Sequence, residues 1–267
     1  MNLSDVNARG LVLLGCGKMG SAMLQGWLAQ GVKAGSVWVN DPFPSDWLRA
    51  TGVNLNVALP ALPAIVLIAV KPQMMAEALP TLAALGNGPT LFVSVAAGTT
   101  IAFYERVLGV NTPIIRAMPN TPAAVSRGIT AICGNAAATE AHLALAEALL
   151  AAVGQVVRLE GEHQMDAVTG LSGSGPAYVF HMIEAMARAG EAVGLAPDLA
   201  MTLARATMCG AGELAHQAPE SAEQLRINVT SPGGTTAAGL AVLMEELPDL
   251  MARTVAAATN RGKELGK

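Results

Sequence analysis

Three glycines near the start of the chain have the spacing of a phosphate-binding turn. The segment LVLLGCGKMG places Gly15, Gly17 and Gly20 after an apolar run and at the start of a helical stretch. In G-x-G-x-x-G, the first glycine allows a tight turn, the second lets the backbone approach a pyrophosphate, and the third lets helix and strand pack closely. The helix N-terminus then presents N–H groups to the phosphates. This placement favours a dinucleotide site over an ordinary glycine-rich turn.

An acidic residue, Asp41, follows the second apolar run about 20 residues after the last glycine. In dinucleotide-binding folds, an acid here binds the adenosine ribose hydroxyls and disfavours a 2′-phosphate. Read alone, Asp41 favours NAD over NADP, although a cap for the turn ahead of Pro42 explains it nearly as well. Further cofactor contacts are expected at residues 69–72 and 94–98, because open α/β sheets bind ligands at the carboxyl ends of their strands.

Three loops carry backbone chemistry rather than reactive side chains. They are MPNTP at residues 118–122, LSGSGPAY at 171–178 and NVTSPGGTT at 228–236. The third combines glycines and hydroxyls at a predicted helix start, so its N–H groups could hold a small carboxylate. For each loop alone, an elaborate cap is the alternative.

The chain has little equipment for acid–base or metal chemistry. No lysine lies between Lys71 and Lys263, and neither Tyr104 nor Tyr178 is followed by a lysine four residues on. A Schiff-base lysine in the second half and a Tyr/Lys dehydrogenase are therefore disfavoured, and no spacing of Asp, Glu or His suggests a metal site. A carbonyl substrate would need a strong proton donor, whereas an imine nitrogen is basic enough to be protonated before hydride arrives. A hydroxyl such as that of Thr236 could then orient the nitrogen.

Composition narrows the class of protein. The 267 residues are 52% hydrophobic and 13% charged, with a net charge of −4, which argues against disorder and against a nucleic-acid partner. The densest apolar stretch, residues 62–70, is far short of the ~20 residues that cross a bilayer, so no membrane is expected. The start MNLSDVNARG has no apolar signal core, and the three cysteines form no CxxC, so we expect a cytoplasmic protein.

Strand-like and helical stretches alternate up to about residue 160 and predict a Rossmann-type, doubly wound, mostly parallel sheet. After that point no strand is expected, only Ala/Met/Leu-rich helices. We therefore expect a dinucleotide-binding domain over 1–160 and an all-helical domain over 161–267, whose apolar helices form the subunit interface. The expected strands are 10–14, 36–40, 64–70, 90–95, 113–117, 128–133 and 155–159, and the expected helices of the first part are 19–30, 74–85, 100–108 and 139–153.

Six segments in order resemble the pyrroline-5-carboxylate reductase family: GCGKMG, AVKP, SVAAG, RAMPNTP, GLSGSGPAYVF and NVTSPGGTTAAGL. They extend over essentially the whole chain from about Gly10, and RAMPNTP and SPGGTT are far more specific than the glycine pattern. The resemblance implies a helical dimerisation domain and reduction of the cyclic imine 1-pyrroline-5-carboxylate to L-proline by NADPH or NADH. It also implies a homodimer through the helical domain, with higher assembly of dimers, often to a decamer in this family.

Matched positions assign the site residues. The implied cofactor contacts are Leu14, Gly15, Cys16, Gly17, Lys18 and Met19 at the pyrophosphate, Ala69, Val70, Lys71 and Pro72 along the next strand end, and Val95, Ala96 and Ala97 at the nicotinamide. The implied substrate contacts are Asn228, Ser231, Gly234, Thr235 and Thr236. In the family, the threonine that matches Thr236 is proposed to donate a proton to the imine nitrogen, which makes Thr236 the candidate catalytic residue.

Two departures from the family pattern leave the choice of cofactor open. Asn40 and Asp41, which we also include among the cofactor contacts, stand where NADPH-preferring members often have small or basic residues. The stretch 52–62 looks shortened, so the asparagine expected near the ribose is either Asn54 or Asn56.

Two other functions compete. A β-hydroxyacid dehydrogenase has a similar plan and would match at Gly170, Gly173 and Gly175, but Val179 stands where that chemistry needs a lysine. A non-catalytic nucleotide-binding regulator is the other alternative, and the intact SPGGTT loop argues against it.

Overall fold

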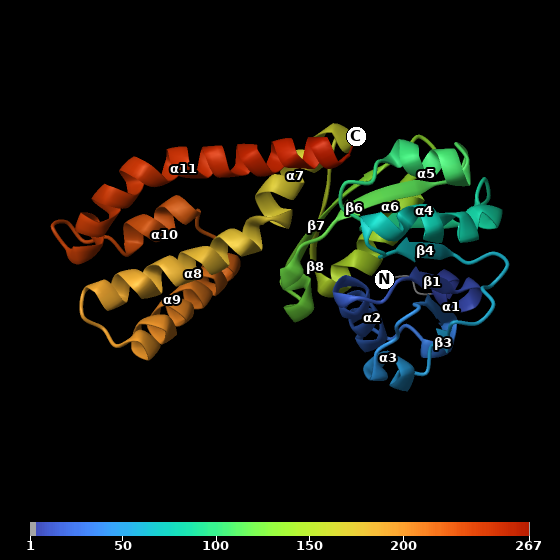
Figure 1. Cartoon of the computed structure of the whole chain (residues 1–267), viewed down its shortest axis with the longest axis horizontal. Coiled ribbons are helices and arrows are strands. Elements are labelled where there is room, and N and C mark those ends of the chain that lie inside the picture. Colours follow the sequence, from blue (N-terminus) through green and yellow to red (C-terminus); the bar gives the residue numbers. More distant parts are fainter. Residues whose placement is uncertain (1–3, 267) are drawn as a thin grey trace. The chain divides into compact units, whose positions relative to one another are not determined.

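The computed structural model describes residues 4–266, and residues 4–173 together with 258–266 form the first of two compact units. An eight-stranded sheet lies at its centre in the order β3-β2-β1-β4-β5-β6-β7-β8 (Figure 1). Only the β6–β7 pair of this sheet is antiparallel, so the predicted doubly wound, mostly parallel fold is confirmed. The strands are β1 (Leu11–Leu14), β2 (Val37–Asn40), β3 (Asn54–Leu55), β4 (Ile65–Ile68), β5 (Leu91–Ser94), β6 (Ile114–Met118), β7 (Gly128–Gly134) and β8 (Gly154–Arg158).

Helices cover both faces of this sheet because its strands alternate buried side chains between two cores. Leu11 and Leu13 of β1 pack on one face with Trp27, while Val12 and Leu14 pack on the other face with the side chain of Tyr104. The helices of the first unit are α1 (Ser4–Arg9), α2 (Lys18–Ala29), α3 (Asp46–Ala50), α4 (Met75–Ala78), α5 (Ile101–Leu108), α6 (Glu140–Leu150) and α7 (Met165–Val168), joined by short 3₁₀ turns.

The seven predicted strands and four predicted helices of the first part all have counterparts within a few residues. Three short elements were not predicted: β3, α1 and α3. The strand β3 has two residues, Asn54 and Leu55, which pair with β2, so it is too short to give an alternating pattern.

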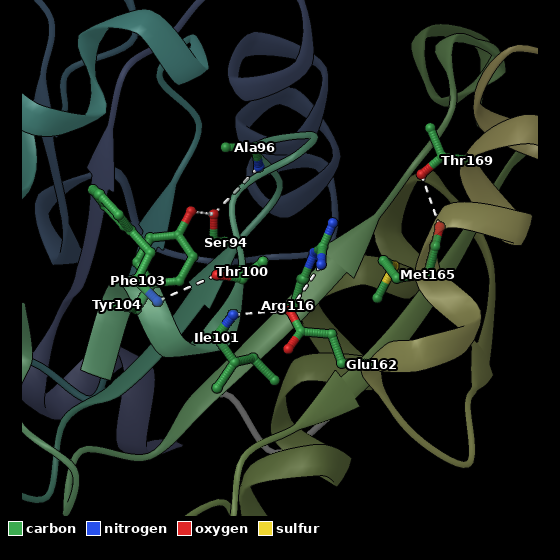
Figure 2. Close-up of polar contacts among 10 residues, drawn as sticks. All are labelled: Ser94, Ala96, Thr100, Ile101, Phe103, Tyr104, Arg116, Glu162, Met165 and Thr169. Carbon is green, nitrogen blue, oxygen red and sulfur yellow. Dashed lines mark hydrogen bonds and ion pairs between the residues drawn. The ribbon is translucent and has the colours of Figure 1, made fainter. Parts of the chain in front are cut away.

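A partly buried ion pair joins three parts of the first unit. The guanidinium of Arg116 in β6 is 2.7 Å from a carboxylate oxygen of Glu162, and the Arg116 side chain is only 5% exposed. The same oxygen accepts the N–H of Ile101, the first residue of α5, at 2.8 Å (Figure 2). The carboxylate thereby connects β6, the start of α5 and the turn before α7.

The second compact unit, residues 174–257, contains helices joined by loops and no strand. Its elements are α8 (Gly175–Ala192), α9 (Pro197–Gln217), α10 (Ala222–Asn228) and most of α11 (Thr235–Leu265), and α8 and α9 lie side by side (Figure 1). The unit leaves many large apolar side chains exposed in the single chain, among them Phe180, Met201, Leu203, Leu243 and Met244. Within residues 4–266, no helix has the length and apolar character needed to cross a bilayer.

We predict that Glu162→Ala destabilises the protein by about 2 kcal/mol, because the buried guanidinium of Arg116 loses its partner and the first N–H of α5 loses its acceptor. The cost stays below the ~3–5 kcal/mol of a fully buried pair because the Glu162 side chain is 30% exposed. Chemical unfolding at a fixed protein concentration measures the change.

Glu160→Ala is the matched control, since Glu160 is exposed and, among the described residues, its hydrogen bond comes from its main-chain N–H, which binds the side chain of Gln164. Equal unfolding midpoints for the two variants would contradict a structural role for the ion pair.

Candidate cofactor and substrate sites

The glycine turn has the geometry that a pyrophosphate needs. Gly15 has a φ of +86°, and a Cβ there would lie 2.9 Å from the Cγ1 of Val70. A Cβ on Gly20 would lie 2.5 Å from the carbonyl oxygen of Gly15, so helix α2 packs directly on the turn. A Cβ on Gly17 would instead meet no atom within 4 Å, and this residue caps α2 with no side-chain hydrogen bond. The turn therefore leaves open space at an uncapped helix N-terminus, which suits a phosphate group.

Main-chain hydrogen bonds connect the ends of four parallel strands next to this turn. Each bond continues the ladder one step beyond the strands, so the predicted cofactor residues form a row along the carboxyl edge. The bonds run from Gly15 N–H to Asn40 O at 2.8 Å, from Ala69 N–H to Leu14 O at 2.8 Å and from Val95 N–H to Ile68 O at 3.0 Å.

The carboxylate of Asp41 accepts two main-chain N–H groups. One oxygen binds the N–H of Cys16 in the glycine turn at 2.6 Å, and the other binds the N–H of Phe43 at 2.7 Å. Asp41 is buried, with 9% of its surface exposed, yet it lines the cavity at this edge. Asp41 therefore caps the following turn, as the second interpretation of this residue predicts. It also lies at the cavity wall, where an acid could bind a ribose. Each carboxylate oxygen keeps a second lone pair for a ribose hydroxyl.

The two asparagines of the shortened stretch lie at opposite ends of β2. The side chain of Asn56 binds the main-chain N–H and carbonyl of Asp41 at 2.9 and 2.8 Å, and this residue has a φ of +53°. The amide of Asn54 instead donates to the carbonyls of Gly35 and Val37, at the start of the strand. Of the two, Asn56 is thus the asparagine beside Asp41, whose main chain it fixes.

A cavity of about 740 Å³ opens at this edge, within the size range of small-molecule sites. Eight of the predicted cofactor residues line it, while Leu14, Met19, Asn40, Pro72 and residues 95–97 are not part of its wall. The eight are Gly15, Cys16, Gly17, Lys18, Asp41, Ala69, Val70 and Lys71.

Two aromatic residues of the cavity were missed in the sequence. Phe43 is 87% exposed and Trp47 is 39% exposed, and both line the cavity beside Asp41. Flat aromatic faces suit the stacking of a base. Their spacing could have indicated them. Aromatic residues make up only 3% of the chain, and two of them follow Asp41 within six positions.

A second cavity of about 510 Å³ lies elsewhere in the first unit and contains Pro72 and Ala97. Thr99, Arg106 and Asp166 contribute polar groups to its wall. Ala97 is exposed, whereas Ala96 is buried and Val95 packs partly against the core, so the turn 95–97 presents one small side chain to solvent.

The predicted substrate loop lies in the helical unit, between α10 and α11. Gly233 has a φ of +71°, and the N–H of Gly234 binds the carbonyl of Ser231 at 3.0 Å. Thr235 and Thr236 are exposed in the first turn of α11, while the Asn228 side chain accepts from Gln224. A Cβ on Gly234 would lie 2.6 Å from the hydroxyl oxygen of Ser231, so a side chain there would disturb the loop. The loop thus presents two hydroxyls at the N-terminus of a long helix.

Cys16 is not a reactive thiol. Burial, reinforced by the nearby negative charge of Asp41, raises the pKa of its thiol to about 11, so it stays protonated at neutral pH. In the part of the chain that the structure describes, no group of three or more His, Cys, Asp and Glu side chains is placed to hold a metal ion.

Two family models match separate parts of the chain. Residues 162–265 match the family described as pyrroline-5-carboxylate reductase dimerisation, and residues 11–98 match NADP oxidoreductase coenzyme F420-dependent. Among curated relatives, the pyrroline-5-carboxylate reductase of Pseudomonas aeruginosa is 36% identical over 96% of this chain and 97% of its own length. That of Haemophilus influenzae is 40% identical over 87% of this chain and 88% of its own length.

Solved structures of the same enzyme are similar over nearly the whole chain. A pyrroline-5-carboxylate reductase from Coxiella burnetii superposes with a TM-score of 0.92 and 35% identity, covering 97% of this chain and 99% of that one. The Plasmodium falciparum enzyme with NADP bound has a TM-score of 0.83 and 28% identity, covering 98% and 99%.

We predict that Cys16 in the native, nucleotide-free protein reacts with iodoacetamide at pH 8 roughly a hundredfold more slowly than in the unfolded chain, because a pKa near 11 instead of 9.0 leaves that much less thiolate. The labelled fraction, read by peptide mass spectrometry, should rise about tenfold per pH unit up to that range. Asp41→Asn, which removes the repelling charge, should speed the labelling; equal rates in the native and unfolded chains would show that the thiol is not perturbed.

Proposed function

We propose how the residues of this chain, which belongs to the pyrroline-5-carboxylate reductase family, divide the work of its reaction. That reaction is the last step of proline synthesis, the reduction of 1-pyrroline-5-carboxylate to L-proline with hydride from NADPH or NADH. Residues 1–160 bind the cofactor, and residues 161–267 form the helical dimerisation and substrate domain. The observation that carries this proposal is the row of strand ends beside the glycine turn. An uncapped helix N-terminus, the acidic residue Asp41 and a cavity all lie at this edge of the first unit.

Three stretches hold the cofactor in this proposal. Residues 14–19 hold the pyrophosphate on main-chain N–H groups, Asn40 and Asp41 meet the adenosine ribose, and residues 69–72 line the strand end between them. Phe43 and Trp47 add aromatic faces for the adenine. Val95, Ala96 and Ala97 contact the nicotinamide. The bound cofactor supplies the hydride, and the protein supplies position.

The loop between α10 and α11 holds the substrate. The carboxylate binds N–H groups of Ser231 and Thr235 at the start of α11, where the helix dipole favours an anion. Gly234, whose own N–H is bonded to the carbonyl of Ser231, shapes the loop around it. The hydroxyl of Thr236 orients the ring nitrogen and is a proton source for it. Asn228 completes the set, with its side chain held by Gln224. Because the imine nitrogen is already basic, positioning supplies most of the rate.

Subunit association is the remaining part of the proposal. The helical unit exposes more large apolar side chains than a monomer keeps in water, and residues 162–265 match a dimerisation family. A homodimer through this domain buries them, and dimers join further, up to a decamer. We place the protein in the cytoplasm, since Cys16, Cys133 and Cys209 are all free.

We predict that Thr236→Ala lowers kcat by roughly a hundredfold, the low end of the range for a lost proton-transfer group, with little change in the dissociation constant of NADH. Steady-state kinetics at 340 nm and nucleotide fluorescence titration measure the two quantities. Thr236→Ser keeps the hydroxyl and should recover most of the rate.

Thr254→Ala is the matched control, because it removes a hydroxyl from the same helix. Among the described residues, this hydroxyl bonds to the carbonyl of Leu250, one turn earlier in the helix. Unchanged turnover in Thr236→Ala would remove Thr236 from the mechanism.

We predict that Asp41→Ser raises kcat/KM for NADPH relative to NADH by about tenfold, because it removes the negative charge that repels a 2′-phosphate. Asp46→Ser, an equal charge change at an exposed position outside the cavity wall, should leave the ratio unchanged. An unchanged ratio in Asp41→Ser would mean that the carboxylate serves only to bind the N–H groups of Cys16 and Phe43.

A further inference from the structure

We propose that Tyr104 is a positioning residue for hydride transfer: through the hydroxyl of Ser94, its buried hydroxyl holds the turn that carries Val95, Ala96 and Ala97. The inference rests on the proposed function, because it takes these three residues as the contacts of the nicotinamide. Tyr104 lies in α5, outside the glycine turn and the strand ends that bind the nucleotide, and it never meets the reactants.

The contacts of the hydroxyl are short and local. The Tyr104 hydroxyl oxygen lies 2.5 Å from the hydroxyl oxygen of Ser94, the last residue of β5. The Ser94 oxygen in turn accepts the N–H of Ala96 at 3.2 Å, in the middle of the turn (Figure 2). The phenol is therefore bonded to the residue before the turn, and the hydroxyl of that residue binds the main chain in the middle of the turn.

Burial makes these bonds costly to lose. Tyr104 has no exposed surface and Ser94 is 1% exposed, so water cannot replace a missing partner for either hydroxyl. Burial also raises the pKa of Tyr104, which keeps the phenol neutral and able to donate. With its side chain sealed in the core beside Phe92 and Leu108, the phenol cannot reach a substrate as an acid. Its role is positional.

The helix that carries Tyr104 is itself fixed at its start. The carboxylate of Glu162 accepts the N–H of Ile101 at 2.8 Å and is held at 2.7 Å by the buried guanidinium of Arg116 (Figure 2). The hydroxyl of Thr100 also caps this helix through the N–H of Phe103. The phenol therefore extends from a helix whose start is fixed. Such a support suits a turn that must keep the nicotinamide aligned with the imine to within a fraction of an ångström.

Tyr104→Phe tests the inference, because it removes the hydroxyl and keeps the ring in the core. We expect kcat for 1-pyrroline-5-carboxylate with saturating NADH to fall roughly tenfold, while the KM of the imine changes less than about twofold. The primary isotope effect with NADH deuterated at the transferred position should increase, since hydride transfer becomes the slow step.

Thr90→Val is the matched control for a merely structural loss. The Thr90 side chain is equally buried, and this residue lies just before β5, at the end of the strand opposite Ser94. Its hydroxyl donates to the carbonyl of Pro63 at 2.9 Å. It should lower the melting temperature as Tyr104→Phe does and leave kcat and the isotope effect unchanged. Parallel changes in kcat for the two variants would overturn the inference.

Ser94→Ala reports on the same turn from its other side and covers the case that Tyr104→Phe does not fold. It should reproduce the tenfold fall, and combining it with Tyr104→Phe should add little, because both remove one linked set of bonds. Wild-type kcat in Ser94→Ala would overturn the inference.

Ala97→Leu separates this inference from the proposed function on which it depends. Ala97 is exposed, so leucine fits the fold but obstructs a nicotinamide lying on the turn. Lost turnover in Ala97→Leu beside normal kcat in Tyr104→Phe would overturn the positioning role alone. Normal turnover in Ala97→Leu would overturn the nicotinamide assignment, and the inference with it.

Discussion

One constraint organises the first unit: four parallel strands end together and are tied to one another just past their ends. The main-chain bonds from Gly15 to Asn40, Ala69 to Leu14 and Val95 to Ile68 leave these loops little freedom to move independently. A dinucleotide is long, so it must be contacted at several separated points at once, and a row of tied strand ends supplies them without ordering each loop on binding. Leu14 and Asn40 belong to this row through their carbonyls, although neither side chain lines the cavity.

Much of this arrangement could be predicted from the sequence because it depends on local patterns. Continuous apolar runs predict strands covered on both faces, and the glycine spacing fixes the first turn and its helix. The antiparallel pairing of β7 with β6 and the two-residue strand β3 have no such signal. Both pairings depend on which main-chain N–H and C=O groups the neighbouring strands leave unpaired. Those groups are determined only when the whole sheet assembles.

The polar contacts of the site were less predictable, because they join residues far apart in the chain. Asp41 could be placed behind the second strand from spacing alone, but its bond to the N–H of Cys16 spans 25 positions. Likewise, nothing in the motifs indicates that Glu162 would accept from both Arg116 and Ile101. Asn54 and Asn56 show the same limit at short range: they differ by two positions, yet the left-handed backbone of Asn56 turns it towards Asp41.

The chemistry explains why so much of the polar structure supports the backbone rather than the reactants. Reduction of a protonated imine needs no strong acid, and the chain has no lysine in its helical unit and no metal cluster among its described residues. What hydride transfer does require is contact and alignment, whose benefit is lost with displacements of about 1 Å. A chain that relies on alignment gains most from bonds that stop its loops from moving. The carboxylate of Asp41 on the glycine turn and the hydroxyl of Ser94 on the N–H of Ala96 are bonds of this kind. Buried polar groups such as Asp41 and Ser94 are therefore the places where we expect this chain to fix the alignment of its reactants.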